Sequence, residues 1–513
     1  MTLFSSSKRI LAEQIAALGF ANPFGTERRD IENRLLAQAP EGLKTPGNRS
    51  AFLQWNDQNR KALRAVARPV IYEAREKLAA GHDGTEAELK IYDDLVLFQL
   101  YYRYSGQFEA VINEVLAGHQ TQDLTYTLYE AFCADAAFFL GVTPRGPKLI
   151  DELPHIFALF FQLTRAFLYI FHFLVGSSAA TNKLRINIWE SIFTHDMRRY
   201  RRKLYDKMGE VPTLITGPSG TGKELVARAI GLSRYIPFDP AKRRFVRYFD
   251  EGFYPLNLSA LSETVMESEL FGHRKGSFTG ASTDRQGFFE KAGDLGTVFL
   301  DEIGEVNEAI QVKLLRVLQT RQFQRLGDTE ERCFQGKIIA ATNRDLALEM
   351  HEGRFRKDFF YRLCADQLTT PSLSAQLSGS AGILEELVDF VATRVAGPDE
   401  GPALACESME WMRKNLPSDY PWPGNFRELE QCVRNIMIRR DYNPPQAHRL
   451  APSDQLGTLL ANLELSADDL LSQYVTHIYA REGSYEAAAR VLDMDRRTVK
   501  ARTDEKLLQK IRS

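Results

Sequence analysis

Cysteine is scarce and scattered in this chain of 513 residues. Its five cysteines lie far apart, and no two have the CxxC spacing of a zinc or redox site. Because an odd number of distant cysteines does not suggest a disulfide framework, we expect reduced, buried thiols. The first residues also lack an apolar run followed by a small-residue cleavage site, so no secretory signal is expected. Both absences fit a reducing cytoplasm.

Charge of either sign is not in excess. The chain has 65 Lys and Arg against 67 Asp and Glu, a formal net charge of -2, so any surface for nucleic acid must be local. With 44% hydrophobic and 26% charged residues the composition is that of an ordinary soluble protein. The length exceeds what one hydrophobic core supports and predicts roughly three or four domains.

Long apolar runs are almost absent. The segment from His155 to Gly176 is about long enough to cross a bilayer, but it contains Gln162, Arg165 and His172. An arginine in the middle of a membrane helix is costly. We therefore expect a buried or subunit-contact helix, and no membrane partner.

The sequence pattern divides the chain into five segments. Residues 1–185 have helical periodicity and many Phe and Tyr, whereas short apolar runs from about Trp189 onward alternate with helical patterns and predict an α/β domain with a mostly parallel sheet. In the remaining sequence, stretches rich in Gly, Ser and Pro mark the segment boundaries. The predicted segments are a mainly α domain at 1–185, an α/β core at 186–374, a helical subdomain at 375–441, a linker at 442–465 and an all-α tail at 466–513.

A phosphate-binding loop is predicted at Thr213 to Glu224, TLITGPSGTGKE, where an apolar strand leads through a glycine-rich turn into a helical run. The glycines allow backbone N–H groups to surround phosphate oxygens, and Lys223 reaches the terminal phosphates. A chance glycine-rich turn is the minor alternative. Glu224 replaces the usual magnesium-binding Ser or Thr, so magnesium must be held elsewhere. The candidate nucleotide ligands are Gly217, Pro218, Ser219, Gly220, Thr221, Gly222, Lys223 and Glu224.

Candidate catalytic residues follow two later strands. Asp301 and Glu302 end GTVFLDE, where Asp301 is suited to hold magnesium and Glu302 to polarise the attacking water. Asn343 ends KIIAATN and could orient that water, although a simple turn residue is the ordinary interpretation. Arg356 and Arg362, in GRFRKDFFYRL, can project toward a neighbouring subunit's nucleotide, with surface salt bridges as the competing interpretation.

The chain resembles the sigma-54-dependent enhancer-binding activators of the AAA+ class from about Leu214 to Asn435. GPSGTGKE is similar to that family's phosphate loop, including Glu after Lys, and ESELFGHRKGSFTGA is similar to its signature loop for contacting sigma-54. Two residues of this stretch depart mildly from the family pattern. Ser277 replaces the family's first alanine, and Arg274 stands where an acid is more usual. The resemblance implies that the loop residues Gly276, Ser277, Phe278, Thr279, Gly280 and Ala281 contact sigma-54.

Further roles are implied by the same resemblance. Asn257 would couple the state of the γ-phosphate to Glu302 and the loop, and Arg427 in WPGNFREL would sense nucleotide from the lid; alone, either would be interpreted as a cap or a surface ion pair. The implied fold is an α/β AAA+ P-loop core with a helical lid. The implied cofactors are ATP and Mg²⁺, and the implied partners are sigma-54 RNA polymerase, enhancer DNA and further copies of the chain, in a hexamer in the bacterial cytoplasm. The stretch CADQLTTPSLSAQL after Arg362 departs from the family pattern.

The tail predicts a helix-turn-helix. Residues 483–502, GSYEAAARVLDMDRRTVKAR, give two short helices around a turn at Asp493 to Asp495, with an apolar seam that includes Val491 and Val499. The module is similar to the Fis-type domain that ends many members of the family, and a plain basic helical hairpin is the alternative. The candidate DNA ligands are Arg496, Arg497, Thr498, Lys500 and Arg502.

Two other functions stay open at this level: a AAA+ remodeller of a different protein, and a DNA-binding repressor with a vestigial ATPase. GSFTGA argues against the first, and the complete catalytic set argues against the second. No acidic pocket of a phosphorylatable receiver is found in residues 1–185, so the signal that this domain receives is not predicted.

Overall fold

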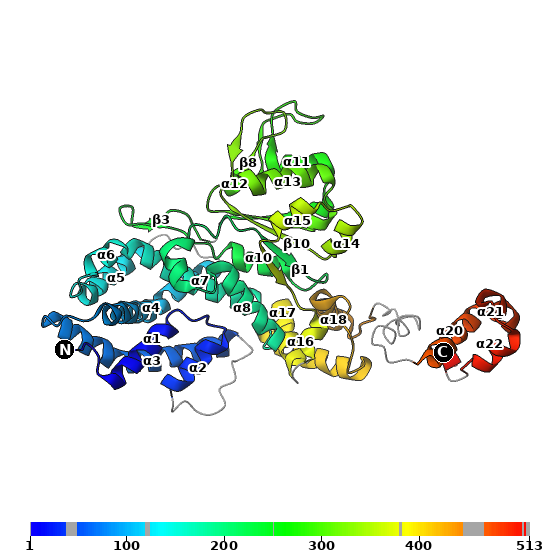
Figure 1. The fold of residues 1–513 in the computed structure, drawn as a ribbon, viewed down its shortest axis with the longest axis horizontal. Coiled ribbons are helices and arrows are strands. Elements are labelled where there is room, and N and C mark those ends of the chain that lie inside the picture. The colour runs from blue at the N-terminus through cyan, green and yellow to red at the C-terminus, as the bar shows by residue number, and fades with distance from the viewer. Residues whose placement is uncertain are drawn as a thin grey trace. The chain divides into compact units, whose positions relative to one another are not determined.

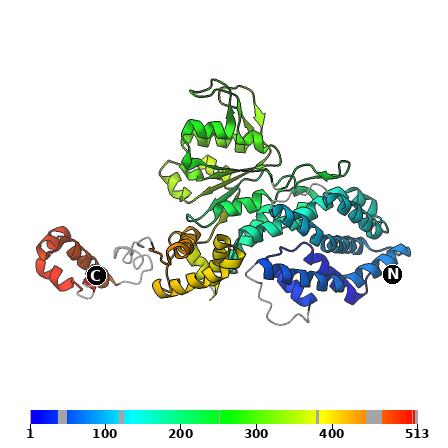
Figure 2. The same cartoon turned by 180° about the vertical axis from the view of Figure 1, so that it is seen from behind.

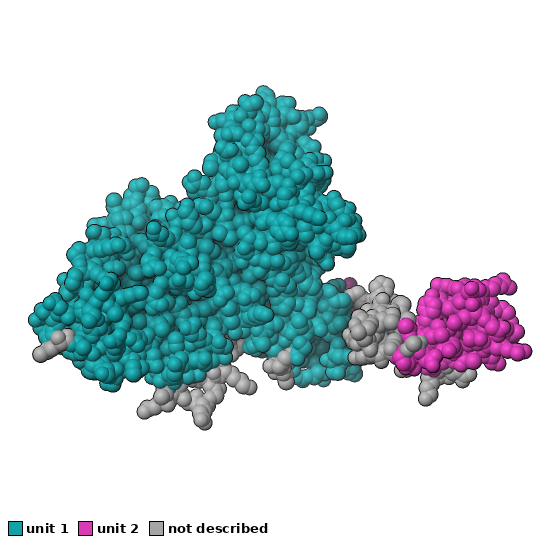
Figure 3. Space-filling view, viewed as in Figure 1, with its two compact units in different colours: residues 1–437 teal, residues 438–513 magenta. Residues whose placement is uncertain are grey.

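The computed structural model describes residues 2–36, 49–117, 124–249, 251–378, 382–444, 466–504 and 507–508. The chain divides into two compact units, Met1–Met437 and Ile438–Ser513, which Figure 3 distinguishes by colour. From residue 445 onward, the linker predicted at 442–465 lies outside the described residues, as do residues 379–381 of the predicted helical subdomain.

The N-terminal part of the first unit is helical. Its helices are α1 Ser6–Leu18, α2 Thr26–Leu35, α3 Arg49–Ala79, α4 Glu86–Leu116, α5 Leu124–Leu140, α6 Gly146–Asp151, α7 Leu153–Phe173, α8 Ala179–Phe193 and α9 Met197–Arg199, followed by the π-helix η1 Tyr200–Leu204. Helix α4 begins with a capping box, in which Thr85 and Glu88 each bond the other's backbone N–H. Figures 1 and 2 show α7 and α8 between the earlier helices and the α/β core, and both contact α10.

Helix α7 contains the apolar run considered above as a membrane span. It is the one helix among the described residues that is long and apolar enough for this, and 83% of its most apolar window is buried inside the molecule. Its polar residues satisfy backbone groups of the core: Gln162 donates to the Ser233 carbonyl at 2.9 Å, and the buried Arg165 donates to the Arg234 carbonyl. Here α7 is a core helix, and its polar residues fasten it to the α/β domain.

The α/β core is built on a five-stranded sheet in which every neighbouring pair is parallel, in the order β11-β1-β10-β7-β4. Its strands are β1 Thr213–Thr216, β4 Phe253–Asn257, β7 Thr297–Asp301, β10 Lys337–Thr342 and β11 Asp366–Thr369. All residues of β10, and all but the last of β7, are buried, as expected for strands covered on both faces. The fold class predicted for this segment is confirmed.

Helices and small hairpins connect these strands. The helices are α10 Lys223–Gly231, η2 Leu258–Ala260, α11 Glu263–Phe271, α12 Phe288–Ala292, η3 Ile303–Glu305, α13 Glu308–Thr320, α14 Leu346–His351 and α15 Lys357–Leu363. The antiparallel hairpins pair β2 Phe238–Asp239 with β3 Arg244–Phe245, β5 Gly272–His273 with β6 Arg285–Gln286, and β8 Gln322–Phe323 with β9 Arg332–Cys333. Three helices complete the unit: α16 Leu373–Leu377, α17 Ile383–Asn415, which is broken at Gly397, and α18 Asn425–Arg439.

The second unit contains α20 Ala467–Glu482, α21 Tyr485–Leu492 and α22 Arg496–Arg502. Its core joins Val475 and Ile478 of α20 to Ala488 and Val499. The prediction that Val491 belongs to this seam is wrong, because half of its surface is exposed. The apolar residues of α21 and α22 pack against α20, a helix that the two-helix pattern did not include.

The cysteine prediction is wrong in part. Among the five thiols, only Cys432 is buried, while Cys333 and Cys406 are exposed and Cys133 and Cys364 are intermediate. All five are free. Cys333 lies on the short hairpin of β8 and β9, and Cys406 lies on an exposed face of α17. The sequence pattern did not predict the exposure of either residue.

Candidate active site

The phosphate loop leaves the carboxyl end of β1 and requires glycine by its backbone geometry. Gly217 has φ +142°, and a Cβ there would lie 2.7 Å from the Thr370 carbonyl oxygen. Gly220 has φ +77°, and its Cβ would lie 2.5 Å from the Gly424 carbonyl oxygen. A side chain at either position would therefore push the loop away from β11 or from the helical subdomain.

Lys223 is the first residue of α10. Its Nζ donates to the carbonyls of Gly217 at 2.9 Å and Pro218 at 3.2 Å, across the mouth of the loop. Burial lowers the pKa of Lys223, and the carboxylates of Glu302 and Asp301 oppose that shift. The cation and the start of the helix favour a bound phosphate, and the two carboxylates lie next to them.

Two acids lie at the end of β7, next to the phosphate loop. Burial, and then the neighbouring Glu302 carboxylate, raises the pKa of Asp301. Glu302 has φ +56°, and its Oε2 accepts the backbone N–H of Asn343 at 3.4 Å. The structure thus brings Asn343 to Glu302 through its backbone, while its side chain is exposed. No group of three or more His, Cys, Asp or Glu side chains suited to a metal occurs in the described part of the chain.

Asn257 and Glu224 lie beside these acids, each with a local partner. Asn257 is the register partner of Asp301 across β4 and β7, and its Oδ1 accepts from the N–H of Ser259 at 3.0 Å. Glu224, one residue after Lys223, pairs with Arg228 one helical turn later, at 2.8 Å. Both side chains are thus engaged by partners within four residues of them in the sequence.

The helical subdomain reaches the phosphate loop through α18. Arg427 Nη1 donates to Ser219 Oγ at 3.2 Å. Asn425, buried and with φ +54°, donates from Nδ2 to the Ser219 carbonyl at 2.9 Å and accepts the N–H of Leu373 at 2.8 Å. Asn425 thus links the loop, α16 and α18, although the sequence pattern identified only Arg427.

A cleft of about 420 Å³ collects most of these residues. Of the predicted set it is lined by Ser219, Gly220, Thr221, Gly222, Lys223, Glu224, Asp301, Glu302 and Arg427. Its other walls come from Val175, between α7 and α8, from Leu184 of α8, and from Leu387 and Phe390 of α17. These apolar walls escaped the sequence analysis, since they come from distant segments without a motif. They suit the flat apolar face of a nucleotide base.

The two candidate arginine fingers differ. Neither lines the cleft of its own chain. Arg356 is engaged by Asp358 at 2.8 Å and Glu308 at 3.0 Å, which is the competing interpretation given above. Arg362 is exposed near the end of α15 and has no ion pair among the described residues. Of the two, Arg362 is the one presented to solvent.

The GSFTGA loop follows β5 and is closed by a bond from the Gly276 N–H to the Ala281 carbonyl at 2.8 Å. Gly276 and Gly280 have φ of +82° and +105°, a backbone conformation that favours glycine. Phe278 packs edge-on against the buried His273, with 5.0 Å between ring centroids, while Thr279 is exposed. Arg274, the departure noted in the sequence, pairs with Asp284 at 2.8 Å beneath the loop.

The second unit presents its basic residues on α22. Arg496, Arg497, Thr498 and Lys500 are exposed, and Arg496 pairs with Glu486 at 2.9 Å. Arg502 is only partly exposed and pairs with Asp468 of α20 at 2.9 Å. Arg497 and Lys500 are therefore the residues of this set without an ion pair in the described part of the chain.

Part of the chain is similar to known proteins. Residues 191–369 match the model of the sigma-54 interaction domain. The chain is 41% identical over 242 residues to the Nif-specific regulatory protein of Azotobacter vinelandii, covering 46% of this chain and 42% of that protein. It is 36% identical over 303 residues to the regulatory protein LuxO of Vibrio cholerae, covering 56% of this chain and 62% of LuxO. With the transcriptional regulatory protein ZraR of Escherichia coli it shares 41% identity over 229 residues, 45% of this chain and 47% of that one. The match spans about half the length of these relatives.

Proposed function

We propose that the chain, whose residues 191–369 match the sigma-54 interaction domain, is a sigma-54-dependent activator that hydrolyses ATP to open promoters held by sigma-54 RNA polymerase. One observation carries the proposal: Lys223, Asp301, Glu302 and Arg427 meet at one cleft, in a AAA+ domain whose GSFTGA loop exposes Thr279. The first set can hold and cleave a nucleotide, and the loop is available to a partner.

Hydrolysis follows from the placement of these groups. The N–H groups of the loop and Lys223 hold the phosphates, and Asp301, with phosphate oxygens, would hold a Mg²⁺ ion that neutralises charge on the terminal phosphates. The two adjacent carboxylates fit such an ion, which commonly takes only one or two protein ligands. Glu302 polarises the attacking water, and its bond to the Asn343 backbone fixes the carboxylate toward the nucleotide.

Assembly completes the site in this proposal. Arg362 is solvent-facing and does not line its own chain's cleft, so a second copy of the chain would receive it as an arginine finger. Arg356 would serve as a second trans contact after exchanging its pairs with Asp358 and Glu308. A ring, hexameric by resemblance to the family, follows from one finger and one cleft per subunit.

The C-terminal tail would bind DNA. Arg497 and Lys500, with Arg496, Thr498 and Arg502, would contact enhancer DNA from α22 in the cytoplasm of a bacterium. The proposal as a whole is tested by adding the protein and ATP to closed complexes of sigma-54 polymerase, with sigma-70 polymerase on its own promoter as the control. ATP-dependent opening of the first alone supports the proposal. Promoter opening without ATP would contradict the proposal, and so would a protein that hydrolyses ATP but does not open the promoter.

A further inference from the structure

A pocket of about 570 Å³ lies at the amino end of the central sheet, opposite the end that carries the nucleotide cleft. Its lining includes three cations: Arg234, which follows α10, Arg321, which follows α13, and Lys337, the first residue of β10. The pocket shares no lining residue with the nucleotide cleft. Its volume is in the range of small-molecule sites.

The three cations come together on one short segment, residues 208–211, which leads into β1. Their contacts on this segment are Lys337 Nζ to the Val211 carbonyl at 2.9 Å, Arg321 Nη2 to the Glu210 carbonyl, and Arg234 Nη2 against Gly209. A Cβ at Gly209 would lie only 2.3 Å from that nitrogen of Arg234. Three charges from three separate elements are therefore held against four consecutive residues.

Backbone bonds on the other side of the cluster also bring these residues together. Nη1 of Arg234 donates to the Gly296 carbonyl at 2.5 Å, and the backbone N–H of Lys337 donates to the same oxygen at 3.0 Å. Nη1 of Arg321 donates at 3.1 Å to the carbonyl of Gly336, the residue before Lys337. The three side chains thus border the same space.

The partners of these cations carry no charge. Among the described residues the three cations bond backbone carbonyls and form no ion pair with a carboxylate. Of the acids on the lining, Glu210 pairs with Lys207 at 2.9 Å, while Asp206 and Asp294 are exposed. Lys337, in contrast, is only 2% exposed. The inner wall of the pocket is therefore cationic, and its acids lie in solvent.

Repulsion among the cations affects their protonation. Burial lowers the pKa of Lys337 to about 8; the Asp366 carboxylate opposes this shift, and the charges of Arg234 and Arg321 add to it. Burial also lowers the pKa of Arg234 to about 10, and the Arg321 charge adds to that shift. A bound anion would relieve this repulsion.

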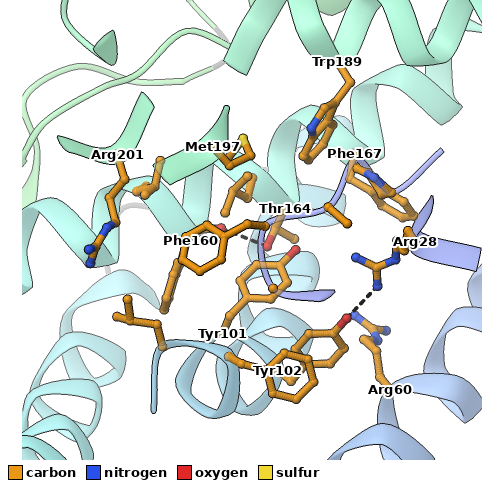
Figure 4. Close-up of a pocket in the computed structure, with 18 of the residues that line it drawn as sticks. Arg28, Arg60, Tyr101, Tyr102, Phe160, Thr164, Phe167, Trp189, Met197 and Arg201 are labelled. Carbon is orange, nitrogen blue, oxygen red and sulfur yellow. Dashed lines mark hydrogen bonds between the residues drawn. The ribbon is translucent and has the colours of Figure 1, made fainter. Parts of the chain in front are cut away.

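Arginines elsewhere in the same unit are neutralised within the chain. In the smaller cavity drawn in Figure 4, Arg28 pairs with Glu32 at 2.8 Å, and Arg60 pairs with Glu109 at 3.2 Å. The larger pocket has no such acid for its three cations. This difference indicates an anion from outside the chain.

We propose that this pocket binds the phosphate group of a small phosphate monoester through Arg234, Arg321 and Lys337. A phosphate has three free oxygens that accept charge-assisted hydrogen bonds from different directions, and its charge near −2 balances more of the cluster than a carboxylate does. The rings of Tyr205 and Tyr235, with centroids 4.7 Å apart, also line the pocket and suit an apolar or aromatic ester group.

A phosphate at this site would act on the connection between the N-terminal helices and the core. Residues 208–211 join η1 to β1, and the phosphate loop leaves the other end of β1. A ligand held by Arg321 and Lys337 would link this segment to α13 and β10. Hydrogen exchange of residues 205–211 should therefore become slower when the ligand binds.

Calorimetric titration of the full-length protein with phenyl phosphate and inorganic phosphate tests the proposal, at fixed ionic strength and with excess ADP to occupy the nucleotide cleft. Phenol, which lacks the phosphate, and benzoate, which carries a single negative charge, are the ligand controls. We expect saturable binding of phenyl phosphate, weaker binding of inorganic phosphate and benzoate, and none of phenol. Lys223→Ala should bind phenyl phosphate as the parent does, because Lys223 lies in the other site.

Charge variants locate the site. Arg234→Gln and Arg321→Gln should each weaken phenyl phosphate binding at least about tenfold, the usual weight of a charge-assisted hydrogen bond. Arg321→Lys keeps the charge and should retain part of the affinity, which a purely structural role would not predict. Arg202→Gln, an exposed residue outside the pocket, is the matched control and should bind as the parent does.

Far-ultraviolet circular dichroism checks that each variant is folded. If neither glutamine variant folds, Gly209→Ala replaces them, because its Cβ displaces the Arg234 guanidinium while every charge remains, and it should also weaken binding. Absence of saturable phenyl phosphate binding, its loss when ADP is added, or equal binding of phenol or benzoate would overturn the proposal. Unchanged affinity in the folded charge variants, or in Gly209→Ala where it replaces them, would overturn it as well.

Discussion

Asn425 should couple the helical subdomain to the phosphate loop. Asn425→Ala removes a bond to the Ser219 carbonyl and leaves the buried N–H of Leu373 without an acceptor. Leu373 is the first residue of α16, so its own helix cannot replace that acceptor. The orphaned N–H costs about 1–3 kcal/mol and the lost bond about 1 kcal/mol. Alanine at φ +54° adds about 1–2 kcal/mol.

Asn425→Gly separates these contributions, because glycine tolerates the positive φ and lacks only the amide. For Asn425→Gly the two hydrogen-bond terms amount to about 2–4 kcal/mol, which corresponds to at least about 30-fold faster amide exchange. Hydrogen exchange followed by mass spectrometry over residues 371–378 measures this effect, and nucleotide titration measures the accompanying loss of ATP affinity. Asn435→Ala is the control, since among the described residues its side chain bonds only the Gln431 carbonyl of the same helix. Unchanged exchange and unchanged affinity in both Asn425 variants would refute the reasoning.

Three further predictions concern catalysis, assembly and DNA. Lys223→Ala should abolish ATP binding, whereas Glu302→Gln should keep binding and lose about 10²- to 10⁴-fold in turnover, as nucleotide titration and phosphate release would show; equal affinity for Lys223→Ala and the parent would contradict the assignment. Specific ATPase activity should rise with protein concentration. Mixing Lys223→Ala with Arg362→Ala should restore turnover that neither variant has alone. A fully active monomer would contradict this prediction. Removing residues 466–513 should eliminate salt-sensitive enhancer binding in a mobility-shift titration while leaving ATP turnover intact; retained enhancer affinity would show that another segment reads DNA.

The phosphate loop and its acids were predictable because each is a local pattern. A strand, a glycine-rich turn and a helix occur in order around Lys223, and Asp301 ends an apolar strand, so parallel pairing alone puts both at one edge of the sheet. The burial of the apolar run in α7 was also predictable from sequence, because Arg165 within it indicates a buried protein contact.

What escaped prediction depends on contacts between distant segments. The apolar walls at Val175 and Phe390 become one surface only when α17 folds over the loop, and neither residue belongs to a motif. The same holds for Asn425, whose neighbour Arg427 has the recognisable role. In the tail, periodicity over two helices placed Val491 inward, but packing against α20 selected another face of α21. The sequence also could not distinguish Arg356, which is engaged in ion pairs, from Arg362, which is exposed.

Thr279 provides the most direct test of whether nucleotide hydrolysis acts on sigma-54 through the GSFTGA loop. The residue is exposed and does not line the nucleotide cleft, so Thr279→Ala should leave ATP affinity, assembly and turnover near those of the parent. Thr283→Ala, an exposed threonine beyond the same loop, is the matched control. ATP turnover and opening of a sigma-54 promoter are measured on the same preparations. We expect Thr279→Ala to hydrolyse ATP without opening the promoter while Thr283→Ala does both; full promoter opening by Thr279→Ala would contradict the account.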